Sequence, residues 1–206
     1  MNTTRGQLLI ISAPSGAGKT SLIKALVEQD TRVEVSVSHT TRPKRPGEAE
    51  GINYFFVSTE AFHTMREAGA FFESAQVFGH FYGTSLAQLE SRLAEGADVI
   101  LEIDWQGAQQ VQSLLPDSAW LFILPPSIDA LKARLQARGQ DADDTIDIRM
   151  NAAREEMSHW EEANYLIIND DFGTALGELQ ALVRTLRLRT GQQQSTLQDL
   201  IEDLLA

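Results

Sequence analysis

The sequence contains no cysteine and only four lysines. Without cysteine the chain can form neither a disulfide framework nor a thiolate metal site. It has no apolar run near the ~20 residues that a membrane-spanning helix needs. Its first residues also lack the charged, apolar and small-residue segments of a secretory signal peptide. We therefore expect a cytoplasmic protein without a membrane partner.

The chain is also poor in positive charge, with a net charge of −12 over 206 residues. This balance argues against binding along a nucleic-acid backbone or an anionic membrane. Most of the basic residues are arginines, whose planar guanidinium suits bidentate contacts with phosphate. They form two groups, one of Arg42, Lys44 and Arg45 and one of Arg134, Arg138, Arg149 and Arg154. The grouping fits either small anions bound at specific places or a solvated surface with scattered ion pairs.

Short apolar segments alternate along the chain with segments of helical periodicity. Those at residues 8–11, 99–103, 120–124 and 165–168 have the length and composition of buried strands. Continuous apolar strands separated by helices indicate a parallel sheet that helices cover on both faces. The fold class predicted from the residues is therefore α/β.

Other segments predict further elements. Alternating or aromatic stretches at residues 33–37 and 54–57 indicate strands, and we expect residues 79–83 to break the extended stretch that begins near Phe71. The final segment has Leu197, Leu200, Ile201, Leu204 and Leu205 on one face of an amphipathic helix. We expect this helix to pack on its own domain, with a contact between subunits of a homo-oligomer as the alternative.

A phosphate-binding loop is indicated between the first strand and the first helix. Its residues are Ala13, Pro14, Ser15, Gly16, Ala17, Gly18, Lys19 and Thr20. They follow G-x-x-x-x-G-K-[ST] in the required strand-to-helix context, except that Ala13 replaces the first glycine. The glycines allow successive N–H groups to face one anion, while Lys19 can reach phosphates and Thr20 can bind Mg²⁺. An unrelated glycine-rich turn is the alternative.

The loop alone does not distinguish between motor proteins, GTPases and kinases. The N-K-x-D motif that reads guanine in GTPases is absent from the sequence. The strand at residues 99–104 ends in Glu102 and Asp104, which could hold water on Mg²⁺ or bind a polar group of a substrate. Two acids at the end of an apolar strand favour a site over a solvated strand end. Which acid lies nearer the metal stays open.

A second candidate site lies at residues 38–54. Arg42 and Arg45 are three positions apart in a loop stiffened by prolines. Their guanidinium groups could converge on one phosphate, with the hydroxyls of Ser38 and Tyr54 beside them. A surface loop of the same composition remains the alternative.

This stretch resembles the GMP-binding signature of guanylate kinases, since it follows S-x-T-T-R-x-x-R-x-G-E-x-x-G-x-x-Y from Ser38 to Tyr54. Further matches occur in chain order at residues 72–75, 82–84, 101–107, 125–127, 134–139, 149 and 169–170. Together they cover nearly the whole chain. The resemblance is to guanylate kinases of bacterial type. It implies a parallel sheet of the P-loop NTP hydrolase type flanked by helices, with a GMP-binding insertion and a helical lid.

The resemblance also implies a division of the chain and roles for its residues. One domain would span residues 1–206, with a core at about 1–35, 90–133 and 157–206, a GMP-binding region at about 36–89 and a lid at about 134–156. GMP would be bound by Ser38, Arg42, Arg45, Tyr54, Glu73, Tyr82, Thr84 and Asp104, although a core aromatic is nearly as good an interpretation of Tyr82. The residues from Ala13 to Thr20, together with Asn169, would bind ATP. The catalytic residues would be Lys19, Arg42, Arg134, Arg138 and Arg149, with Thr20 and, through water, Glu102 at the metal.

The activity that the resemblance implies is Mg²⁺-dependent transfer of the ATP γ-phosphoryl group to GMP, and by extension to dGMP, in purine nucleotide metabolism. Glu73 and Asp104 favour guanine over the bases of other nucleoside monophosphate kinases, because carboxylates accept hydrogen bonds and guanine offers N1–H and 2-amino donors. The other rival is a guanylate-kinase-like module that binds protein partners without catalysis. Such modules typically lack an intact phosphate loop, which this chain has.

Overall fold

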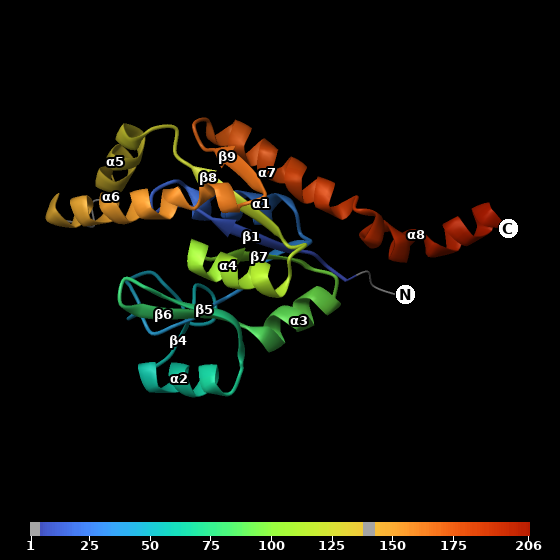
Figure 1. The fold of residues 1–206 in the computed structure, drawn as a ribbon, viewed down its shortest axis with the longest axis horizontal. Helices are drawn as coiled ribbons and strands as arrows, with labels where there is room; N and C mark the ends of the chain where they lie inside the picture. The colour runs from blue at the N-terminus through green and yellow to red at the C-terminus, as the bar shows by residue number, and fades with distance from the viewer. Residues whose placement is uncertain (1–4, 138–142) are drawn as a thin grey trace.

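The computed structural model describes residues 5–137 and 143–206, and only the backbone of residues 143–148 and 195. Its centre is a five-stranded sheet in the order β2-β7-β1-β8-β9 (Figure 1). The strands are β1 (Leu8–Ser12), β2 (Val33–Val35), β7 (Asp98–Glu102), β8 (Ala119–Leu124) and β9 (Tyr165–Ile168). All neighbours pair in parallel. The predicted α/β fold with a parallel sheet is confirmed.

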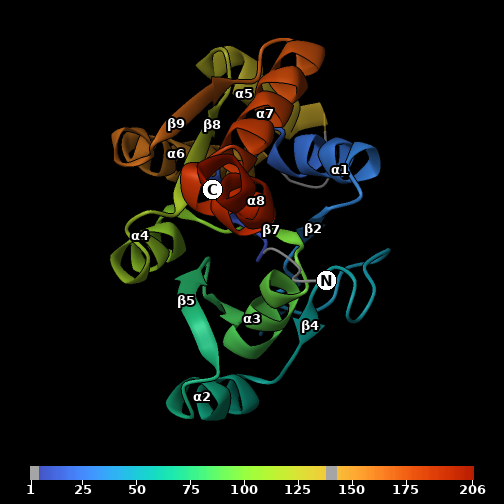
Figure 2. The same ribbon diagram turned by 90° about the vertical axis from the view of Figure 1, so that its right-hand side faces the viewer.

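Helices cover both faces of this sheet (Figures 1 and 2). Helices α1 (Lys19–Gln29) and α7 (Phe172–Arg187) share a core with Leu9 and Ile11 of β1. Helices α3 (Leu86–Ala94) and α4 (Trp105–Leu114) share a second core with Ile10, on the opposite side of the same strand. Because successive side chains of a strand point to opposite faces, both faces of β1 are buried, and this explains its continuous apolar sequence.

A smaller sheet lies beside the central one in the order β4-β3-β6-β5, with helix α2 (Thr59–Glu67) packed below it (Figure 1). Its strands are β3 (His39–Thr40), β4 (Phe55–Phe56), β5 (Phe71–Val77) and β6 (His80–Ser85). Strands β5 and β6 form an antiparallel hairpin that turns at Phe78 and Gly79, both with positive φ.

The predicted break at residues 79–83 is therefore wrong for most of its length. Gly83 lies within β6 and pairs with Ser74. A β-carbon at Gly83 would lie 3.0 Å from the Phe71 ring and 3.2 Å from that of Phe62. The glycine makes room for two aromatic rings in the middle of a strand, and it does not end the strand.

Two helices carry the predicted lid. Helix α5 (Ile128–Ala137) packs against α6 (Asp143–Ser158) through Leu131, Leu135, Met150 and Ala153. A 3₁₀ turn, η1 (Trp160–Glu162), then leads to β9. The predicted boundaries at residues 89/90, 133/134 and 156/157 fall inside α3, α5 and α6. The division into core, GMP-binding region and lid stays a prediction.

The last helix, α8 (Thr190–Leu205), extends away from the body of the molecule (Figures 1 and 2). Leu200 is 53% exposed, Leu204 74% and Leu205 82%. The prediction that this helix packs on its own domain is wrong, because the chain changes direction after α7 and leaves the apolar face in solvent. No helix in the described parts of the chain combines the length and apolarity needed to cross a bilayer.

Candidate active site

The loop between β1 and α1 has the conformation that its sequence predicts. Gly16 and Gly18 have φ values of 94° and 96°, a region that favours glycine. The loop is closed by a hydrogen bond from the Ala17 N–H to the Pro14 carbonyl at 3.0 Å. A side chain at Gly18 is also excluded sterically, because its β-carbon would lie 2.3 Å from Nδ2 of Asn169. The loop leads directly into the N-terminus of α1, an arrangement that binds anions.

Two polar side chains support this loop through hydrogen bonds to backbone carbonyls. The buried amide of Asn169 donates from Nδ2 to the Ala17 carbonyl at 2.7 Å. The Arg134 guanidinium donates to the Asn169 carbonyl at 2.8 Å and to that of Ala17 at 3.4 Å. Both side chains therefore brace the phosphate loop. Their predicted contacts, with the ATP adenine for Asn169 and with the transferred phosphoryl for Arg134, stay predictions.

The acids that end β7 take different positions. The Thr20 hydroxyl donates to Oε1 of Glu102 at 2.5 Å, so Glu102 is the acid that contacts the predicted metal ligand. Asp104 caps α4, and its Oδ1 accepts from the Gly107 N–H at 3.0 Å. Between them, Lys19 Nζ donates to the Ile103 carbonyl at 3.2 Å.

The smaller sheet contributes a further carboxylate to the site. Glu73 in β5 is only 4% exposed, and its Oε1 accepts from the hydroxyl of the fully buried Thr84 at 2.6 Å. Burial raises the pKa of Glu73 to about 7, against the opposing effect of the Thr84 hydrogen bond and with help from the negative charge of Asp104. Burial also raises the pKa of Asp104. A carboxyl group that titrates near neutral pH is common at functional sites.

One cavity of about 270 Å³ joins these groups. Its walls combine residues of the phosphate loop with residues of the smaller sheet and the end of β7. Among them are Gly16, Gly18, Lys19, Thr20, Ser38, Tyr54, Glu73, Tyr82, Glu102, Asp104 and Glu156. The structure thus brings most of the predicted site residues, from positions 13 to 104, around a single space.

The two arginines of the 38–54 stretch are placed differently. Arg42 is largely buried, its guanidinium lies 5.3 Å from the centre of the Tyr54 ring, and its Nη2 donates to Glu48 at 2.6 Å. The bond to Glu48 raises the pKa of Arg42. Arg45 is exposed and donates to Glu48 through its backbone N–H at 2.7 Å. Glu48 therefore fixes this loop, a role that sequence reasoning missed although Glu48 stands within the recognised signature.

Helix α6, in the predicted lid, contributes an acid that was not predicted. Glu156 accepts a hydrogen bond from the Ser15 N–H of the phosphate loop at 3.0 Å, and burial raises its pKa. Arg149 lies two turns earlier on the same face of α6 and is partly buried. Arg138, also predicted to be catalytic, lies outside the described residues. No sequence signal could have paired Glu156 with a residue 141 positions away.

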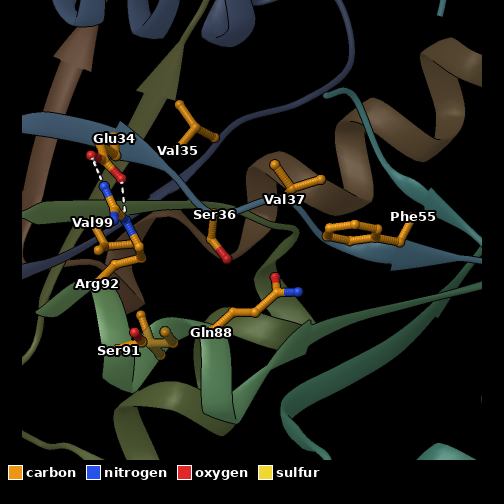
Figure 3. A pocket seen from close by; sticks show the side chains of 10 residues that line it. Glu34, Val35, Ser36, Val37, Phe55, Gln88, Ser91, Arg92 and Val99 are labelled. Atoms are coloured by element: carbon orange, nitrogen blue, oxygen red, sulfur yellow. Dashed lines mark hydrogen bonds and ion pairs between the residues drawn. The ribbon is translucent and has the colours of Figure 1, made fainter. Parts of the chain in front are cut away.

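A second cavity, of about 280 Å³, lies where the two sheets meet (Figure 3). It is lined by Glu34, Val35, Ser36, Val37, Phe55, Gln88, Leu89, Ser91, Arg92 and Val99. Figure 3 shows the Arg92 guanidinium paired with the Glu34 carboxylate, so these two charges offset each other. None of the predicted catalytic or binding residues that the structure describes lines this cavity, which separates it from the site at the phosphate loop.

Comparisons with known proteins agree with this arrangement. The family model described as guanylate kinase matches residues 5–186. A guanylate kinase of Hahella chejuensis is 58% identical over 190 residues, which cover 92% of this chain and 91% of the relative. One of Saccharophagus degradans is 57% identical over 204 residues, which cover 99% and 100%. The crystal structure of guanylate kinase from Anaplasma phagocytophilum is 32% identical, with a TM-score of 0.76 over 92% of this chain and 90% of that one. These matches span almost the whole sequence, and the chain belongs to the guanylate kinase family of nucleoside monophosphate kinases.

Proposed function

We propose that the chain transfers the γ-phosphoryl group of ATP to GMP in a Mg²⁺-dependent reaction that yields ADP and GDP. One observation carries the proposal. A single cavity has a phosphate-binding loop on one wall and two carboxylates on another, the buried Glu73 and the half-buried Asp104. The first wall suits a nucleoside triphosphate, and the second suits a base that donates hydrogen bonds.

The donor side would bind the ATP phosphates through the loop N–H groups and Lys19. The hydroxyl of Thr20 and the carboxylate of Glu102 are oxygen ligands of the kind that Mg²⁺ prefers. Among the described residues no cluster of three or more metal-binding side chains occurs. A Mg²⁺ ion here would take its remaining ligands from phosphates and water, and it would neutralise charge on the transferred group.

The acceptor side would bind GMP. Arg42, which Glu48 holds against Tyr54, and Ser38, which lines the cavity, would bind the GMP phosphate. Glu73 and Asp104 would accept hydrogen bonds from guanine N1–H and its 2-amino group. Adenine lacks this donor pair, and a buried carboxylate without a partner is costly. The site would therefore select guanine because a base without these donors leaves the carboxylates unpaired.

Transfer itself needs alignment and charge neutralisation more than covalent chemistry. Lys19 lines the cavity at the end of the phosphate loop, and its ammonium group would approach the γ-phosphoryl. The lid arginines, among them Arg149 and Arg138, would add positive charge as the lid closes and excludes water. We assign no protein nucleophile. We also infer a cytoplasmic enzyme of purine nucleotide metabolism that accepts dGMP as well as GMP.

The test is an assay of ADP production with GMP, AMP, dTMP and UMP as acceptors. We expect GMP to be preferred over AMP by ~10⁴-fold in kcat/KM, because a site that must pair a buried carboxylate rejects a base without donors. Comparable rates with AMP would contradict the proposal. GMP binding without turnover would instead favour the interaction module.

A further inference from the structure

Helix α4 contacts the smaller sheet through an unusual pair of hydrogen bonds. The side-chain amide of Gln110 donates from Nε2 to the Ser74 carbonyl at 2.9 Å. Its Oε1 accepts from the Ser74 N–H at 3.2 Å. Strand β5 lies at one edge of the sheet, so this amide occupies backbone groups on the side away from β6. Gln110 thereby acts as a short strand partner next to Glu73.

One turn earlier on the same helix face, the backbone of α4 approaches Glu73 itself. A β-carbon at Gly107 would lie 2.7 Å from Oε2 of Glu73, a distance that real β-carbons essentially never show. Glycine weakens a helix relative to alanine, so this position has a packing reason for its glycine. Because Glu73 is buried and its Oε1 is bonded to Thr84, the carboxyl group has little room to move away.

The same helix begins at the second carboxylate. Asp104 is the N-cap of α4, and its Oδ1 accepts from the Gly107 N–H. One helix therefore carries Asp104 at its first turn, touches Glu73 at Gly107 and binds the neighbouring Ser74 at Gln110. Glu73 belongs to the smaller sheet, whereas Asp104 follows a strand of the central one. Helix α4 fixes the spacing of these carboxylates across the two sheets.

We propose that Gly107 and Gln110 are specificity-determining positioning residues, which hold Glu73 at the distance from Asp104 that guanine requires. Neither touches the base. This inference rests on the proposed function, in which the two carboxylates read guanine. It predicts that loosening α4 from β5 damages recognition of the base while leaving the ATP side of the cavity intact.

Two variants test the inference, Gly107→Ala and Gln110→Met, the second of which keeps the length of the side chain and removes both hydrogen bonds to Ser74. Gly177→Ala is a matched control for the first, since Gly177 also lies in a helix and a β-carbon there would have nothing within 4 Å. Gln109→Ala is a control for the second, because Gln109 bonds to Glu162 and not to β5.

We expect Gly107→Ala to raise KM for GMP about tenfold and Gln110→Met about fivefold, the effect of losing one or two well-placed hydrogen bonds. KM for ATP should change less than about twofold. Inosine monophosphate keeps N1–H and lacks the 2-amino group, so the preference for GMP over it should fall by a similar factor. The control variants should leave both quantities within about twofold.

Three results would overturn the inference. In the first, both variants fold with unchanged GMP affinity and unchanged preference over inosine monophosphate. In the second, KM for ATP rises as much as KM for GMP, which would indicate general loosening of the fold. In the third, Gln110→Met alone has no effect; this exposed change should fold even if Gly107→Ala does not. Failure of the unaltered chain to prefer GMP over AMP would instead reject the proposed function.

Discussion

The two walls of the cavity are built in different ways. The phosphate loop is eight consecutive residues, seven of which line the cavity, and it is braced by Asn169 and Arg134. The acceptor wall consists of side chains from β5, β6 and the end of β7, brought together by contacts between two sheets. The donor wall therefore depends on local conformation, whereas the acceptor wall depends on how distant segments are held. A substitution in one wall should therefore impair the function of that wall and leave the other intact.

Lys19→Met should give the largest difference between the effects on the donor wall and on the acceptor wall. Removing the ammonium group from the donor wall should lower kcat by ~10³-fold, because it removes a preorganised positive charge from the transferred phosphoryl. GMP affinity, measured by calorimetry without ATP, should stay within about threefold. A loss of kcat below about tenfold would show that Lys19 does not serve the transfer, and Lys24→Met on the exposed face of α1 is the control.

The acceptor wall is tested by Glu73→Gln. A charge-assisted hydrogen bond contributes more than a neutral one, and its loss should weaken GMP binding by ~100-fold. The KM for ATP should stay within about threefold, and the Thr84 hydroxyl can still donate to the amide oxygen. Equal losses for both nucleotides would contradict the separate construction of the walls.

A pH series sharpens the same point. The pKa of Glu73 is about 7 in the folded chain, above the ordinary 4.5, so the folded state holds an extra proton between these values. The contribution of Glu73 to stability is therefore fully present below pH 4.5 and is lost as pH rises through 7. GMP needs the ionised carboxylate, so its binding should release a proton and weaken about tenfold from about pH 8 to about pH 6.

The GMP phosphate also titrates near pH ~6, so the difference between the unaltered chain and Glu73→Gln isolates the carboxyl group. Titration calorimetry in buffers of different ionisation enthalpy measures the released proton directly. Identical pH profiles for the two proteins would exclude Glu73 as the titrating group.

The smallest effect is expected from Glu156→Gln. The Glu156 carboxylate accepts from the Ser15 N–H, close to where the loop would bind an anion. Replacing it by an amide keeps the acceptor and removes a negative charge, so ATP should bind roughly threefold to tenfold more tightly. GMP affinity should not change. Weaker ATP binding in the variant would mean that the carboxylate supports the loop and does not oppose the phosphates.

The donor wall could be predicted from sequence because its signal is contiguous. Strand, loop and helix follow one another from Leu8 to Gln29, and the glycines lie at the positions where φ is positive. On the acceptor wall, Asp104 could be singled out as an acid at the end of an apolar strand, but Glu73 came only from a resemblance, since nothing local distinguishes it from a surface glutamate. Burial and the contact with Thr84, eleven residues away, give Glu73 its shifted pKa.

The supporting residues could not be predicted for the same reason. Gln110 binds a residue 36 positions away and Glu156 one 141 positions away, so neither pair has a sequence pattern. Gly83 was misinterpreted as a break because the two rings that require it are invisible to local rules. Helix α8 was predicted correctly as a helix, but its exposed position was not. The periodicity of the sequence shows that the helix has an apolar face and does not show what packs against that face.

The contact between Gln110 and Ser74 also bears on how the chain avoids its own copies. An outer strand presents backbone donors and acceptors that can recruit a strand from another molecule. At Ser74 both groups are already engaged by a side chain from α4, at the middle of β5. A foreign strand could not pair in register there without first displacing that amide. The hydrogen bonds that hold the acceptor carboxylate thus also guard the sheet against edge-to-edge aggregation.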